Sequence, residues 1–396
     1  MITARRRTQF VLGLAAAVVL ILAGLALDAG KAPGGHLRSG PIRLAQGPGA
    51  PPESYVRGAS LYRQGRQRVT LDAAAQAPLV GPLAPVAVRS GEGRFLAYNT
   101  WADVRTLDPD LSLSKQGIAP GEPVGTPSVR VYDETLGRDV VLERGAYSPA
   151  WRGDGAIAYA RGLSDAFRPG RPYLTQVVVR ASLRAPSVAW TDVPAHYVVY
   201  GWAGARLLVY RVGDDEQIET LVLDGPGRLR LLSEGSVVAI SPEGERVFVL
   251  GPDNRHVRVL RIADGSEVAA LDPATADPSL DWIAYSGSWV GERVVASASP
   301  GLVVFRAVGS SISVEQVLTF DHNAIPAGVQ EPLFTDASAT NVVATADLPP
   351  QSGRPAETVF LECDRVTRAC LRGEPVPARD WLRFVQNPSR PDGGPR

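Results

Sequence analysis

Histidine is the side chain that most often moves protons or binds zinc, and the chain has only four: His36, His196, His256 and His322. No two of them have the close spacing of a zinc-hydrolase motif such as His-Glu-x-x-His. His322 lies in a polar Asp-His-Asn sequence that predicts a loop, and we name it as a candidate for binding a ligand or partner. A histidine that only shapes the turn is the alternative. The spacing predicts no metal site.

Motifs for nucleophiles and cofactors are equally scarce. The chain contains no Gly-x-Ser-x-Gly elbow, phosphate-binding loop or dinucleotide fingerprint. Two acidic clusters, at 108–110 and 214–216, lack the glycine-anchored spacing of a calcium-binding EF-hand and predict solvated turns. We therefore predict no catalytic residue and no cofactor.

Tryptophans offer a different chemistry, because exposed aromatic side chains are enriched in the hot spots of protein interfaces. Trp101 and Trp289 lie near predicted loops, and with His322 they are our candidate binding residues. Packing between neighbouring sheets is the alternative for both tryptophans.

The two cysteines fall on the two arms of a predicted hairpin, 362–371 (ECDRVTRACL). Residues that face each other across antiparallel strands have Cα atoms about 4.5 Å apart, at the short end of the range for a disulfide. We predict a disulfide between Cys363 and Cys370, with two free thiols as the alternative.

Short strands with apolar alternation must position all of these residues. The clearest unit is 236–272, SVVAISPEGERVFVLGPDNRHVRVLRIADGSEVAALD, in which three turn sequences separate four alternating runs. Four antiparallel strands connected in this way form one blade of a β-propeller. Similar turns and strands recur at 90–98 (SGEGRFLAY) and 144–160 (RGAYSPAWRGDGAIAYA).

A period of about 49 residues divides most of the chain into six such units. Their bounds are 86–143, 144–191, 193–234, 236–273, 278–320 and 329–377. We predict an all-β fold with a β-propeller at 86–378, built from six blades of four antiparallel strands. Seven blades are the alternative, because the first unit contains a long irregular insert. The sequences 68–72 (RVTLD) and 381–386 (WLRFVQ) are candidates for a strand that joins the first and last blades.

The Ser-Pro-Glu-Gly turn at 241–244, followed by an apolar strand, resembles the WD40-like repeats of the TolB-like propeller group, and 148–155 is a looser copy. No unit contains the Gly-His and Trp-Asp signature of true WD40 proteins. The resemblance implies a rigid extracytoplasmic platform whose loops bind a protein or ligand. It implies no catalytic residues.

Residues 10–27 (FVLGLAAAVVLILAGLAL) are uncharged and follow three arginines. As a helix they would extend about 27 Å, close to the roughly 30 Å of a hydrocarbon core. The positive-inside rule then places 1–9 in the cytoplasm and the rest of the chain outside. We predict a single-pass signal anchor; a cleaved signal peptide, which would release a secreted protein, is the alternative.

Residues 28–85 begin with a Gly/Pro-rich stretch and are predicted to be a linker, with a short helix at 53–67, and 379–396 are predicted to be a C-terminal tail. Lys plus Arg and Asp plus Glu both number 41, so the chain has no net charge. A nucleic-acid binder would carry a basic excess to meet the phosphates, and we predict no such partner.

These observations predict a membrane-tethered extracytoplasmic propeller that acts as a non-enzymatic binding or scaffold module for a protein or cell-envelope component. The alternative is a propeller-type enzyme, similar to a lactonase or a lyase, with its site in the central channel. Carboxylates or histidines on the inner strands would favour the enzyme.

Overall fold

The computed structural model describes residues 37–48, 54–57, 60–63, 66–70, 87–106, 123–163, 174–212, 217–280, 282–299, 301–321, 323, 325, 329–348, 357–377 and 382–386. The chain divides into two units, Met1–Leu37 and Arg38–Arg396, and every assigned strand belongs to the second. The predicted anchor at 10–27 lies outside the described residues. None of the helices in the described part of the chain has the length and apolar character needed to cross a membrane.

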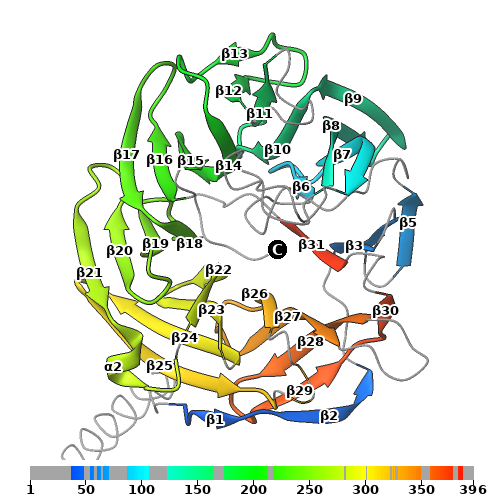
Figure 1. Ribbon diagram of the computed structural model, residues 1–396. Coiled ribbons are helices and arrows are strands. Elements are labelled where there is room, and N and C mark those ends of the chain that lie inside the picture. Colours follow the sequence, from blue (N-terminus) through cyan, green and yellow to red (C-terminus); the bar gives the residue numbers. More distant parts are fainter. Residues whose placement is uncertain are drawn as a thin grey trace, which may run out of the picture. The chain divides into compact units, whose positions relative to one another are not determined.

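The second unit is built from antiparallel four-strand sets that follow one another along the chain (Figure 1). The first three sets are β6 (Ala87–Arg89), β7 (Phe95–Thr106), β8 (Pro123–Asp133) and β9 (Arg138–Arg144); β10 (Ala146–Trp151), β11 (Ile157–Gly162), β12 (Thr175–Arg180) and β13 (Val188–Ala189); and β14 (His196–Ala203), β15 (Arg206–Val212), β16 (Ile218–Leu223) and β17 (Leu229–Glu234).

Three further sets complete the predicted repeat. They are β18 (Ser236–Ile240), β19 (Arg246–Leu250), β20 (Val257–Arg261) and β21 (Glu267–Leu271); β22 (Trp282–Val290), β23 (Arg293–Ser299), β24 (Gly301–Val308) and β25 (Ser311–Thr319); and β26 (Val329–Phe334), β27 (Asn341–Leu348), β28 (Glu357–Asp364) and β29 (Ala369–Arg372). The four-residue helix α2 (Pro273–Ala276) follows β21, with Asp272 as its N-cap. Each set falls on one predicted unit, with bounds that differ by at most five residues, so the predicted antiparallel repeat is confirmed.

The sets surround a common centre, with the first strand of each set innermost (Figure 1). Successive sets are in contact: β10 contacts β7 and β14, β18 contacts β16 and β22, and β22 contacts β26. Apolar side chains such as Tyr197 and Val209 are buried between the sheets. This unit therefore has the architecture of a β-propeller.

The turn between the first and second strands explains why the repeat is visible in the sequence. Ser241 Oγ accepts the backbone N–H of Arg246 at 3.0 Å, and Ser90 Oγ accepts that of Phe95 at the same distance. Gly244 has a φ of +70°, which favours glycine. The looser copy at 148–155 does not align with this turn, because Ser148 lies within the strand β10 and not in the turn that follows it.

The predicted linker at 28–85 requires correction, because the structure places five strands within it. β1 (Gly40–Pro41) and β2 (Arg43–Pro48) pair in parallel with the outer strands β25 and β29. β3 (Ser54–Arg57), β4 (Ser60–Arg63) and β5 (Arg66–Thr70) form an antiparallel meander where a short helix was predicted. An extended segment obtains backbone hydrogen bonds from unpaired sheet edges without a long apolar run of its own.

The predicted C-terminal tail also contains strand structure. β31 (Leu382–Gln386) pairs antiparallel with β3, and its Val385 and Gln386 pair in parallel with Ala87 and Val88 of β6. The short β30 (Val376–Pro377) pairs with β28. The strand predicted at 381–386 therefore joins segments from opposite ends of the unit, and β5 accounts for most of the strand predicted at 68–72.

Candidate functional site

Strand direction gives the propeller two different rims. The turns between first and second strands and between third and fourth strands lie at one end of the strands, which we call the turn rim. The second-to-third connections and the connections between sets lie at the other end, which we call the loop rim. Trp289 is the penultimate residue of β22 and belongs to the turn rim. The connection that follows β25 begins at Asp321 and belongs to the loop rim.

Of the three candidate binding residues, only Trp289 has a described side chain. His322 itself lies outside the described residues. Trp101 lies within β7, where the structure describes the backbone and not the side chain.

Trp289 occupies the interior position that the sequence left as an alternative. Its side chain is 6% exposed, and its ring meets Phe248 edge to face with centroids 6.4 Å apart. The Arg246 guanidinium lies 5.3 Å from the ring centroid, and Trp289 Nε1 donates to the Gly291 carbonyl at 2.9 Å. These contacts hold Trp289 between its own set and the preceding one.

The same packing recurs at two other tryptophans. Trp151, Trp202 and Trp289 each stand two residues before a turn glycine at the end of a first strand. Trp151 stacks on Phe95 of the preceding set with centroids 6.1 Å apart, and the Arg152 guanidinium lies 4.7 Å from the Trp202 ring. A Trp-x-Gly spacing is thus the sequence signal that identifies these residues as inter-sheet packing.

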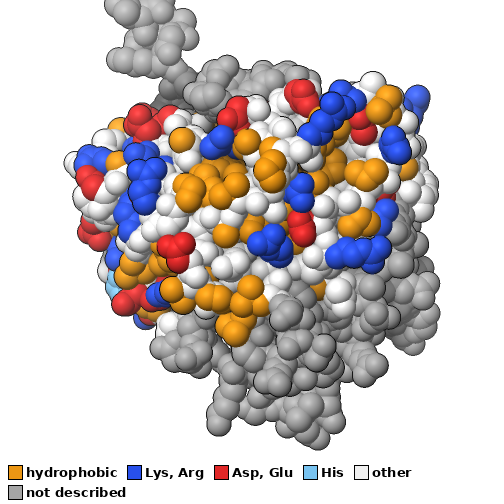
Figure 2. Space-filling model, turned by 90° about the horizontal axis from the view of Figure 1, so that it is seen from above, with side chains coloured by type: hydrophobic (Ala, Val, Ile, Leu, Met, Phe, Trp, Pro, Cys, Tyr) orange, Lys and Arg blue, Asp and Glu red, His pale blue; other side chains and the backbone are white. Residues whose placement is uncertain are grey.

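Arginines at the turn rim are paired with carboxylates. The pairs, with nitrogen–oxygen distances of 2.6, 2.9, 3.0 and 2.9 Å, are Arg94–Asp133, Arg206–Asp224, Arg246–Glu243 and Arg293–Glu315. Basic and acidic side chains are similarly intermixed on the face seen in Figure 2. This rim therefore presents mixed rather than single-sign charge.

The first strands around the centre share a second feature, a shift in their pairing register. The shifts lie between Tyr147/Ala150, Val199/Gly201, Val237/Ala239, Ile283/Gly287 and Gln330/Leu333. Bulges of this kind change the direction of a strand and are frequent beside functional sites.

Side chains of the preceding set satisfy backbone groups near these bulges. Asn99 Oδ1 accepts the N–H of Ser148 at 3.0 Å, and Ser148 Oγ accepts the N–H of Val199 at 3.0 Å. Ser286 Oγ accepts the N–H of Glu331 at 3.2 Å. The inner strands β10 and β22 are thus each hydrogen-bonded to the first strand of the next set.

Polar side chains on the inner strands bear on the enzyme alternative. Glu331 is a half-buried carboxylate on β26, and its φ of +50° is unusual for a residue with a side chain. Tyr200, on β14, donates its hydroxyl to the Val238 carbonyl at 3.2 Å, and burial raises the pKa of this phenol.

The described histidines occupy contrasting sites. His196 is 8% exposed at the start of β14, and burial lowers its pKa to about 4, so the ring is neutral at pH 7. His256 is exposed and contacts Asp253. Burial raises the pKa of Asp253. Hydrogen bonds from the His256 ring and from the backbone lower this pKa by more than burial raises it, and the net result is a pKa of about 2. Among the described residues, no three His, Cys, Asp or Glu side chains form a group able to hold a metal ion.

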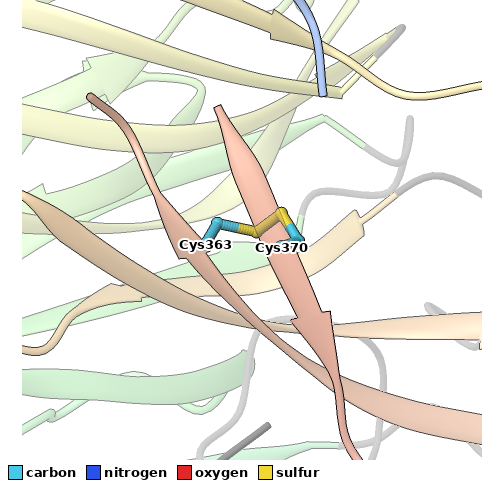
Figure 3. Close-up of a disulfide and its surroundings, with 2 residues drawn as sticks. All are labelled: Cys363 and Cys370. Carbon is cyan, nitrogen blue, oxygen red and sulfur yellow. A yellow bond between two sulfur atoms is a disulfide. The ribbon is translucent and has the colours of Figure 1, made fainter. Parts of the chain in front are cut away.

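The predicted disulfide is confirmed. Cys363 of β28 and Cys370 of β29 face each other directly in the antiparallel register and are bonded (Figure 3). Both residues are at most 1% exposed and pack in the core beneath β2. The bond therefore fastens the outer hairpin of its set.

Comparisons with known proteins identify no family. No protein-family model matches the chain, and no curated protein sequence matches it. The chain spans 44% of the acylaminoacyl peptidase of Pyrococcus horikoshii, at 11% identity over 71% of this chain and a TM-score of 0.42.

Two other solved structures are similar in outline. The Cps50 (Swd1) β-propeller domain of Myceliophteria thermophila has 11% identity and a TM-score of 0.48, with 80% of this chain and 93% of that chain covered. A putative 6-phosphogluconolactonase from Bacteroides fragilis has 13% identity and a TM-score of 0.42, with 86% and 100% covered. Because all of these TM-scores lie below 0.5, the assignment of the fold depends on the sheets described above.

Proposed function

We propose that the protein is a membrane-tethered, extracytoplasmic β-propeller that binds a protein or cell-envelope component and has no enzymatic activity. The observation that carries this proposal is the attachment of residues 38–48, which we call the N-terminal strap, to the outer edges of β25 and β29 (Figure 1). Only ten residues separate the strap from the end of the apolar run at 10–27.

Contacts along the strap support a firm attachment. The Arg38 carbonyl accepts Gln316 Nε2 at 3.1 Å, and Ser39 Oγ accepts the N–H of Val317 at 3.0 Å. Ile42 is 9% exposed and packs in the core that contains Phe320. A chain held in this way next to a membrane anchor would keep the propeller at the membrane surface.

Two finer proposals concern the architecture. We infer that β31 with β3, β4 and β5 forms a seventh blade, because β31 pairs with β3 and contacts both β28 and β6. The hydrogen-bonded turn at Ser241 supports a relationship with the TolB-like propellers.

Photo-crosslinking in intact cells tests the binding function. We place the partner site on the loop rim because the candidate residue His322 follows Asp321 in the sequence. A crosslinking amino acid at exposed Asp321 is therefore expected to capture a discrete partner, whereas one at exposed Glu292 on the turn rim is not. Capture from neither position, or from both equally, would count against a partner site on the loop rim. Retention of the full chain in membranes after carbonate washing tests the anchor separately.

The enzyme alternative rests on Glu331. A lactone- or glycan-cleaving activity of the purified chain that Glu331→Gln abolishes, without loss of stability, would favour the enzyme over the binding module.

A further inference from the structure

The balanced charge of the chain conceals a strong segregation. Residues 1–70 carry ten Lys or Arg and only two Asp or Glu, whereas residues 71–396 carry 31 and 39. The basic excess is therefore not confined to the three arginines before the apolar run. Much of it lies in the strands that precede the first predicted blade.

The structure places this excess on the outer edge of the propeller. Each of β1, β2 and β5 is the terminal strand of a different sheet. β1 lies beside β25, β2 lies beside β29, and β5 is the end of the sheet that contains β31. Arg38 precedes β1, Arg43 lies on β2, and Arg66 and Arg68 lie on β5. All four are exposed, and we call them the basic band.

The strands on or next to which the basic band lies, β1, β2 and β5, contain no acidic residue that could neutralise it. The described residues between 37 and 70 include no Asp or Glu. Arg63, on β4, contrasts with the band because it lies 3.9 Å from Glu134, which follows β8. The four turn-rim arginines described above, Arg94, Arg206, Arg246 and Arg293, are paired with carboxylates and show the same contrast.

We propose that the basic band binds the anionic lipid headgroups of the membrane that holds the anchor, an inference that rests on the proposed tethering. The ten intervening residues span at most about 36 Å, so the anchor would keep the strap near the bilayer. A basic side chain close to an anionic surface strengthens binding by about fivefold. Leu44, on β2 beside Arg43, is 40% exposed and adds apolar surface suited to the headgroup boundary.

The test uses the full chain in nanodiscs of phosphatidylcholine, with or without phosphatidylglycerol. Both native cysteines are bonded, so Thr70→Cys on β5 supplies a unique labelling site, and Leu231→Cys on β17 supplies a control site. We expect a headgroup quencher to reduce fluorescence at position 70 more in discs with phosphatidylglycerol, and to affect position 231 equally in both. Arg66→Ser with Arg68→Ser should remove the difference, whereas Arg138→Ser with Arg184→Ser, two exposed arginines elsewhere, should preserve it.

Equal quenching at position 70 in both kinds of disc, or an equal effect of the two double variants, would overturn the proposal. Co-elution of the chain with neutral discs reports the anchor independently. If the chain does not co-elute, sedimentation with phosphatidylglycerol vesicles still tests the band, with about 25-fold weaker binding expected for the Arg66/Arg68 double variant. Release by inorganic phosphate at constant ionic strength, or tighter binding to a DNA duplex than to these vesicles, would also overturn it.

Discussion

Arg365 is the largest side chain that the described unit buries completely, at 1% exposure. Its Nη2 donates to Glu315 at 2.8 Å and its Nε donates to Gln316 Oε1 at 3.0 Å. It also donates to the Ala339 carbonyl. Because Gln316 in turn donates to the strap, one guanidinium connects two sheets and the N-terminal segment.

Arg365→Ala should therefore lower the free energy of unfolding by about 3–5 kcal/mol, because it leaves buried polar partners unsatisfied. Urea denaturation monitored by tryptophan fluorescence measures the change. Arg261→Ala removes an exposed pair with Asp264 and should cost at most about 1 kcal/mol. Similar losses for the two variants would contradict this role for Arg365.

His196 makes stability depend on acidity. Its folded-state pKa of about 4 lies below the unfolded value of about 6.5, so the unfolded chain binds the extra proton between these values. Stability from this residue is complete above pH 6.5 and decreases as the pH falls toward 4, by at most about 1.4 kcal/mol per unit.

The comparison of His196→Gln with the parent chain isolates this contribution from that of the carboxylates. Between pH 7 and pH 4, the urea midpoint of His196→Gln should fall less steeply with pH than that of the parent chain. The midpoint of the exposed control His256→Gln should fall as steeply around pH 5 as that of the parent chain. Parallel curves for the parent and His196→Gln would show that the ring does not remain neutral in the fold.

At the scale of elements, the strap makes a prediction about Ile42. Ile42→Ala should destabilise the protein by about 2 kcal/mol, because the side chain fills a space in the core beneath β25 and β29. Amide exchange should accelerate at Ile42, whose N–H donates to Thr319, more than at sites on β14. Leu44→Ala, at a more exposed position of the same segment, should cost less than half as much.

The disulfide makes a second prediction at this scale. Thiol labelling of the unfolded chain without reductant should detect no free cysteine, and two labelled thiols would contradict the bond. Cys363→Ser with Cys370→Ser should cost about 2.5 kcal/mol, the chain-entropy value for closing a loop of eight residues. Calorimetry of the oxidised and doubly substituted chains measures the difference.

At the scale of the whole propeller, the closing strand β31 makes a prediction about truncation. Removal of residues 380–396 deletes β31 and leaves β3 and β6 without a common partner. We expect a lower melting temperature and rapid proteolysis within 54–70. Removal of 389–396 alone retains β31 and should leave both properties unchanged; equal sensitivity of the two truncations would contradict closure through β31.

Much of the fold could be predicted because each set is local in sequence. Alternating apolar residues and turn glycines such as Gly244 encode antiparallel hairpins whose partners are only a few residues away. The cysteine pair was predictable for the same reason, since Cys363 and Cys370 lie on one hairpin. Trp289 was harder to interpret, because its partners Phe248 and Arg246 belong to the preceding set.

The sequence by itself determined the antiparallel repeat, the disulfide and the segregation of charge toward the first 70 residues. Only the tertiary structure decided that Gly/Pro-rich residues 38–48 and the strand at 382–386 belong to the propeller. Their pairing partners are sheet edges more than 270 residues distant in the chain, and such edges accept almost any extended backbone. Edge pairing therefore leaves little trace in side-chain pattern, whereas hairpins and buried faces leave a strong one.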